Sequence, residues 1–110
     1  IIQQVRDITG PYFAQQLATL NDHPLVAEVR AVGLFAGIEL VRDSTTMEKI
    51  VDPDETCEVL RDFALKLGII IRPIHSTIFL SPPLIITKIQ IDFLVGNIRI
   101  ALDRWEETLP

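Results

Sequence analysis

The stretch Gly68-Ile-Ile-Ile-Arg72-Pro-Ile-His-Ser-Thr-Ile-Phe-Leu-Ser-Pro-Pro-Leu-Ile-Ile-Thr87 decides how the second half of the chain folds. Its apolar runs at 69–71 and 78–80 predict two short strands, and the polar pair at 75–76 predicts a turn between them. The double proline at 82–83 then ends the extended chain, because proline cannot donate to a strand ladder. We interpret it as a stiff link between the last strand and a helix.

Arg72 is the first candidate for function in this stretch. A guanidinium among apolar residues is costly unless an anion meets it, and no acidic residue lies between positions 68 and 87. The anion must therefore come from elsewhere in the fold or from a ligand. From the residues alone, a structural ion pair with a carboxylate such as Glu39 or Asp92 is the main alternative to ligand binding.

Two helices are expected on either side of this stretch. Asp52 can cap a helix that begins with Pro53, and Gly68 supplies its C-terminal stop. Thr87 and Gln90 form a capping box that opens the last helix. One apolar face of that last helix should dock on a sheet, through Ile91, Leu94, Val95, Ile98, Ala101, Leu102 and Trp105.

The first half of the chain predicts one helix and one or two strands. Helical spacing of apolar residues over 1–20 is interrupted by Gly10-Pro11, where we expect a kink or a break. Strand-like alternation over 25–41 is split at Gly33, which fits two strands or one long bent strand. Residues 42–51 are polar, which predicts a loop. The order helix, strands, helix, strands, helix indicates an α+β layered domain.

Length and composition exclude several classes of protein. A chain of 110 residues with a net charge of −5 fits one domain and argues against nucleic-acid binding. The longest charge-free stretch, 73–87, is too short and too rich in proline for a membrane helix, and no signal peptide opens the chain. The single cysteine, Cys57, excludes an internal disulfide and fits packing in a reducing compartment. We expect a cytoplasmic protein.

The remaining candidate residues favour structural roles. His23 and His75 are predicted turn residues, and neither has a recognised metal-ligand spacing with Cys57 or Asp52. The glycines at 33 and 37 do not form a phosphate loop, so a bulge or close backbone packing is the favoured interpretation. No metal site is predicted. Because the chain opens with Ile1 and its only methionine is Met47, we also expect a fragment of a longer protein.

Two segments resemble the C-terminal domain of class III aminotransferases, which are pyridoxal-phosphate enzymes of fold type I. They are His23-Pro-Leu-Val-Ala-Glu-Val-Arg-Ala-Val-Gly-Leu-Phe-Ala-Gly-Ile-Glu-Leu40 and the run from Arg72 to Thr87, continuing to Ile91-Asp92. The likeness is closest to the ω-amino-acid:pyruvate branch. It implies that residues 1–110 are one small C-terminal domain, with an antiparallel-rich sheet of about three to four strands and helices packed on one face.

The resemblance also implies that substrate binding and cofactor binding belong to different domains. Arg72 corresponds to the arginine that binds the substrate carboxylate, and in the ω-type enzymes this side chain can also swing away. The Schiff-base lysine and the phosphate-binding residues belong to the family's large domain, and Lys49, Lys66 and Lys88 lie in no matching context. The chain therefore has no catalytic or cofactor-binding residue of its own. It is expected to be inactive alone and to bind no pyridoxal 5'-phosphate.

The whole enzyme implied by the resemblance moves an amino group from an amine or ω-amino acid to a keto acid such as pyruvate. Its partners would be these small molecules and the N-terminal cofactor-binding domain, in a homodimer or homotetramer. Two other hypotheses stay open at this point. One is a free-standing regulatory domain that binds amino acids without catalysis, and the other is a dimerisation module that pairs through the apolar face at 91–105.

Overall fold

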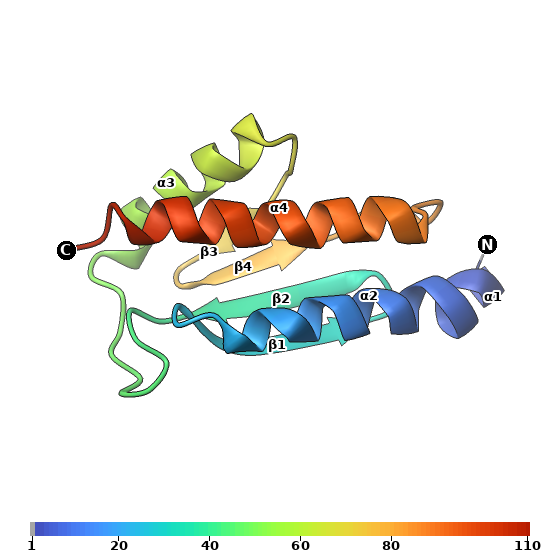
Figure 1. Cartoon of the computed structure of the whole chain (residues 1–110), viewed down its shortest axis with the longest axis horizontal. Helices are drawn as coiled ribbons and strands as arrows, with labels where there is room; N and C mark the ends of the chain where they lie inside the picture. The colour runs from blue at the N-terminus through green and yellow to red at the C-terminus, as the bar shows by residue number, and fades with distance from the viewer. Residues whose placement is uncertain (1) are drawn as a thin grey trace.

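The computed structural model describes residues 2–110 as helices layered on one sheet (Figure 1). Four strands form an antiparallel sheet in the order β1-β2-β4-β3, with β1 at Val26–Val32, β2 at Phe35–Leu40, β3 at Arg72–Ile74 and β4 at Thr77–Leu80. The prediction of an α+β domain with a small antiparallel sheet is confirmed.

The first helical segment bends where the sequence predicts it. It runs through α1 (Ile2–Gln4), a π-helical turn η1 (Val5–Thr9), α2 (Gly10–Ala18) and a 3₁₀ turn η2 (Thr19–Asp22). The backbone N–H of Gly10 donates to the Val5 carbonyl, and a Cβ at position 10 would lie 2.3 Å from that oxygen. The wide turn thus requires glycine, and Pro11 begins the regular helix after it.

A tight hairpin joins β1 and β2, the two strands within the stretch 25–41. Gly33 has φ +58° at the turn between β1 and β2, a left-handed conformation that glycine adopts without a steric cost. The stretch 25–41 is therefore two strands and not one bent strand. The following residues to 51 form the expected loop, with one isolated bridge between Asp43 and Glu48.

The predicted strand at 69–71 is wrong, because the third strand begins at Arg72. The backbone N–H of Ile69 donates to the Ala64 carbonyl at 2.9 Å, so the chain stays close to the end of the preceding helix, α3 (Pro53–Lys66). Ile69 and Ile71 are buried in the core. These residues therefore leave the edge of β4 unpaired beyond Phe79, which pairs with Arg72.

The two long helices are α3 (Pro53–Lys66) and α4 (Lys88–Glu106). The capping box at the start of α4 is present, with Thr87 and Gln90 bonded reciprocally. The expected side-chain cap of α3 is absent. Asp52 adopts φ +49°, and its side chain accepts no capping hydrogen bond.

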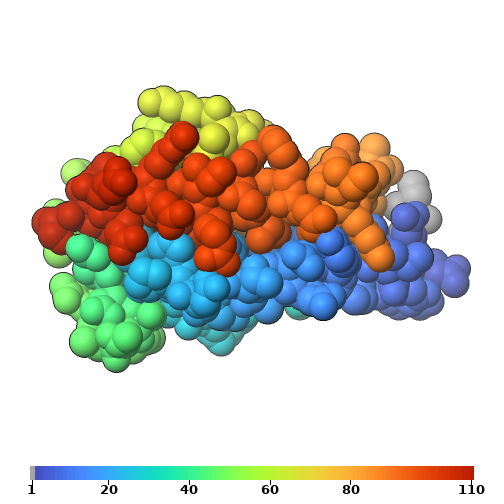
Figure 2. Space-filling model, viewed as in Figure 1, coloured from blue at the N-terminus to red at the C-terminus, as the bar shows by residue number. Residues whose placement is uncertain are grey.

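All the helices pack on one face of the sheet, as expected. In Figure 1 α2 and α4 lie on the near side of the strands, with α3 beside α4 at the β3 edge, and Figure 2 shows α4 and α2 side by side. Most of the predicted face of α4 is buried there: Ile91, Val95, Ile98, Ala101, Leu102 and Trp105. Because this face is buried within the chain itself, it is not available for the dimerisation considered above.

Within residues 2–110, no helix combines the length and the apolar character that crossing a membrane requires.

Candidate functional site

Arg72 lies on the face of the sheet that the helices leave open. It begins the edge strand β3, and its direct partner on β4 is Phe79. Residues paired across antiparallel strands point to the same face, so Phe79 and, one strand further, Gly37 share that face with Arg72. Arg72 is exposed to solvent, which corrects the expectation of a guanidinium enclosed by apolar residues.

Neither carboxylate considered as a structural partner pairs with Arg72. Among the described residues, the ion pairs include no contact of Arg72 with Glu39 or Asp92. Asp92 instead accepts a hydrogen bond from the Tyr12 hydroxyl, and this bond raises the pKa of Tyr12. The Arg72 guanidinium is therefore available to an anion from outside the described chain.

Arg72 lines a cleft of about 950 Å³ that opens where residues 69–71 leave the edge of β4. Because those residues do not pair with β4, the gap extends from the open sheet face to the N-terminal part of α4. Its lining is mainly apolar, and Arg72 is its one charged side chain among the described residues: the apolar set includes Phe35, Ile69, Ile70, Phe79, Leu80, Pro82, Pro83, Ile86, Phe93 and Leu94. Such a cleft suits a ligand with an apolar body and an anionic end.

A second arginine on the same face, Arg30, already has a carboxylate partner within the chain. Arg30 pairs with Glu28 at 3.1 Å. The hydrogen bond to Glu28, with smaller contributions from the charges of Glu28 and Glu39, raises the pKa of Arg30. The two arginines thus differ in what they can bind, although they share a face of one sheet.

The three lysines do not approach the cleft. The ammonium of Lys66 lies 6.0 Å from the centre of the Phe63 ring, and that of Lys88 lies 5.1 Å from the centre of the Tyr12 ring. Lys49 lies in the exposed loop before α3. No lysine belongs to the set that lines the cleft around Arg72.

His75 is the turn residue that the sequence predicts. It is exposed, has φ +54°, and its Nδ1 lies 3.0 Å from Oδ1 of Asp54 at the start of α3. His75 is not among the residues that line the cleft, although it follows Arg72 by three positions. An exposed pair of this kind contributes little to stability.

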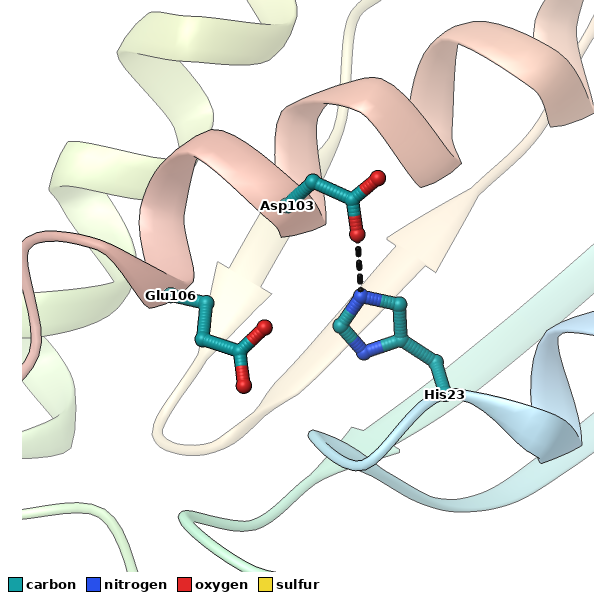
Figure 3. Close-up of side chains that lie close together, drawn as sticks. All are labelled: His23, Asp103 and Glu106. Atoms are coloured by element: carbon teal, nitrogen blue, oxygen red, sulfur yellow. Dashed lines mark hydrogen bonds and ion pairs between the residues drawn. The ribbon is translucent and has the colours of Figure 1, made fainter.

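His23 is not the simple turn residue that the sequence suggests, because it is buried. Its Nδ1 accepts the backbone N–H of Leu25 at 3.2 Å, and its Nε2 lies 2.8 Å from Oδ1 of Asp103 on α4 (Figure 3). Since Nδ1 is an acceptor, Nε2 carries the proton and donates to Asp103. Asp103 is 80 residues away in the sequence, so no local pattern could reveal this partner.

The His23 cluster ties the end of the first helical segment to α4. Glu106 lies near His23 and Asp103, with ligand atoms of all three within 4.8 Å of one another. A metal at Nε2 would move the imidazole proton to Nδ1, where it would face the N–H of Leu25. The hydrogen bond to Leu25 therefore opposes metal binding at Nε2.

Cys57 is buried, as its place in a predicted helix suggests. Burial first, and then the charges of Asp54 and Glu58, raise the pKa of Cys57 to about 11. A thiol in this state is neutral near pH 7 and serves in packing.

The fold is that of an α+β domain, and its apolar cleft is lined by one exposed arginine among the described residues. The sequence of residues 1–102 matches the family described as Aminotransferase class-III, and the chain belongs to this family. Putrescine–pyruvate aminotransferase of Pseudomonas aeruginosa is 38% identical over 104 residues, which are 94% of this chain and 23% of that protein. Ornithine aminotransferase 2 of Staphylococcus aureus is 36% identical over 91 residues, 82% of this chain and 19% of that protein.

Solved transaminases have the same fold. The PMP-bound aminotransferase from Vibrio fluvialis superposes with a TM-score of 0.87 at 26% identity, covering 98% of this chain and 24% of that one. A transaminase solved with L-alanine gives a TM-score of 0.83 at 34% identity, covering 90% and 23%. The chain thus spans less than a quarter of the length of these relatives, and the family resemblance seen in the sequence is confirmed.

Proposed function

We propose that this chain is the small C-terminal domain of an aminotransferase, and that Arg72 binds the carboxylate of its substrates. The complete enzyme would move an amino group from an amine or ω-amino acid to a keto acid such as pyruvate. Family membership supports the class of reaction. The putrescine–pyruvate aminotransferase among the relatives supports an amine donor and pyruvate as acceptor.

The main support for this role of Arg72 is that its guanidinium has no carboxylate partner among the described residues. The guanidinium is exposed at an apolar cleft, and no carboxylate of the described residues pairs with it. A guanidinium can bind a carboxylate through two parallel, charge-assisted hydrogen bonds. The apolar lining would hold the carbon chain of the substrate, so the cleft discriminates by charge at one end only.

The open face of the sheet supports the assignment as one domain of a larger enzyme. A sheet with one solvated face normally places polar residues there. Here Val32 is 81% exposed, Ile74 59% and Phe35 54%. In the complete enzyme this face would lie against the rest of the polypeptide, with Arg72 directed into the cleft between them.

The cofactor would be held outside this chain. Pyridoxal phosphate needs a lysine for its Schiff base and groups for its phosphate, and the described residues do not fit these needs, since no lysine lines the cleft around Arg72. We therefore assign it to the N-terminal part of the same polypeptide. A cytoplasmic location and a homodimer or homotetramer are part of the same proposal.

Replacing Arg72 by alanine in the full-length enzyme tests the proposal. We expect KM for amino acids and keto acids to rise at least about 10- to 150-fold, the equivalent of one lost hydrogen bond to a charged group, because the carboxylate loses its guanidinium partner. KM for simple amines should change less than about 3-fold. Steady-state kinetics on both substrate types gives the comparison.

Arg30→Ala is the matched control, because it removes an arginine from the same sheet face that is already paired with Glu28. It should leave both KM values nearly unchanged. Equal losses on both substrate types in Arg72→Ala would make Arg72 a structural residue.

A further inference from the structure

Phe79 stands between a glycine and Arg72 in one row across the open sheet face. The strand register places Gly37 of β2, Phe79 of β4 and Arg72 of β3 directly beside one another. Because paired residues share a face, the Phe79 ring has two ways to lean, toward Gly37 or toward Arg72. Both Phe79 and Arg72 line the cleft.

The ring leans toward the glycine. A Cβ built at position 37 would lie 3.2 Å from one ring carbon of Phe79, so a side chain there would require the ring to shift by a few tenths of an ångström. Phe35, two residues from Gly37 on the same strand face, stacks on this ring with centroids 5.8 Å apart and planes 20° from parallel. Gly37 and Phe35 therefore hold the ring on the β2 side of its strand.

We propose that Gly37 and Phe79 are positioning residues for Arg72. By seating the ring over β2, Gly37 keeps open the space beside the guanidinium in which a carboxylate approaches it. This inference rests on the proposed role of Arg72 and adds to it the residues that control access. Neither Gly37 nor Phe79 contacts the reacting atoms in this proposal.

Gly37→Ala tests the proposal, because the new methyl group must push the ring aside by a few tenths of an ångström. The ring is held by Phe35 on one side, so the open direction is toward Arg72. We expect the affinity of the full-length protein for hexanoate to fall about 2- to 10-fold, the cost of forcing a side chain off its preferred rotamer. Affinity for hexan-1-ol, which has no charge, should stay the same. Ligand-observed NMR measures both Kd values without turnover.

Gly96→Ala is the control for the change of glycine to alanine. Gly96 lies on the exposed side of α4, and a Cβ there would meet nothing within 4 Å. It should leave both Kd values unchanged. Two further variants test the ring itself: Gly37→Ala with Phe79→Leu should restore hexanoate binding, and Phe79→Trp should weaken it while keeping Gly37. The second of these keeps the test informative if Gly37→Ala does not fold.

The outcomes separate this inference from the proposed function. If Arg72→Ala weakens hexanoate binding but Gly37→Ala and Phe79→Trp behave as Gly96→Ala does, the positioning role is wrong and the carboxylate role stands. If Arg72→Ala has no effect on hexanoate, the proposed function itself fails. Equal weakening of hexanoate and hexan-1-ol by Gly37→Ala would mean that the ring only shapes the apolar wall, and would overturn the positioning role.

Discussion

Arg72 and Arg30 show how the same residue type takes different roles on one sheet face. Arg30 has Glu28 within 3.1 Å, whereas no carboxylate of the described residues reaches Arg72. The sequence indicated part of this, because no acidic residue lies between positions 68 and 87. It could not exclude Glu39 or Asp92, whose distances from Arg72 depend on the packing of the sheet and of α4.

Cys57 allows a prediction at the scale of one residue. With its pKa raised from 9.0 to about 11, mainly by burial, the native thiol should react with an alkylating reagent at pH 8 at least about 100-fold more slowly than the unfolded chain. A thiol-reactive dye followed by absorbance, with and without denaturant, measures the ratio. Similar rates in the two states would contradict the burial of Cys57.

The same shift has a consequence for stability, with a definite sign. Since the folded pKa lies above the unfolded value, the neutral thiol contributes its full stability below pH 9. That contribution should be lost as the pH rises from about 9 to about 11. Cys57→Ala should lack this part of the alkaline decrease in the free energy of unfolding.

At the scale of elements, local capping signals predict some helix starts better than others. Thr87 and Gln90 form the capping box that their spacing indicates. Asp52 precedes α3 but adopts a left-handed conformation and makes no side-chain cap. The strand predicted at 69–71 fails for a related reason, since burial of Ile69 and Ile71 against α3 outweighs their strand preference.

Thr87→Ala should therefore lower the free energy of unfolding by about 1 kcal/mol, because the Gln90 N–H at the start of α4 loses the Thr87 hydroxyl as its acceptor. Thr87→Ser keeps the hydroxyl and should cost much less. Urea unfolding followed by circular dichroism gives the comparison. A loss as large in the serine variant would show that the threonine methyl group, and not the cap, is what stabilises the helix.

At the scale of the whole molecule, helices that the sequence separates meet over one face of the sheet. Trp105 on α4 is fully buried, and its Nε1 donates to the Thr56 carbonyl of α3 at 2.9 Å. His23 joins the end of the first helical segment to Asp103 of α4. The opposite face carries no helix, which leaves Arg72 and the cleft accessible.

Trp105→Phe removes the hydrogen bond to Thr56 and leaves a cavity, so we expect a loss of about 2–4 kcal/mol in the free energy of unfolding. Small domains have only about 5–15 kcal/mol of stability, so this is a large fraction of the whole. Ile89→Ala on the exposed side of α4 is the control and should change the stability by less than about 1 kcal/mol. Chemical unfolding of both variants measures the two losses, and comparable losses would contradict the role of Trp105 in joining α3 to α4.

The sequence by itself determined the helices, the turns, the α+β class and the family, because these depend on residues within a few positions of one another. Tertiary structure decided the rest. The pairs Arg72–Phe79, Gly37–Phe79 and His23–Asp103 come from strand register and helix packing. The cleft lies where residues 69–71, with Ile69 and Ile71 buried in the core, do not pair with β4. Such choices depend on competition between distant apolar contacts and local strand pairing, which no short stretch of sequence contains.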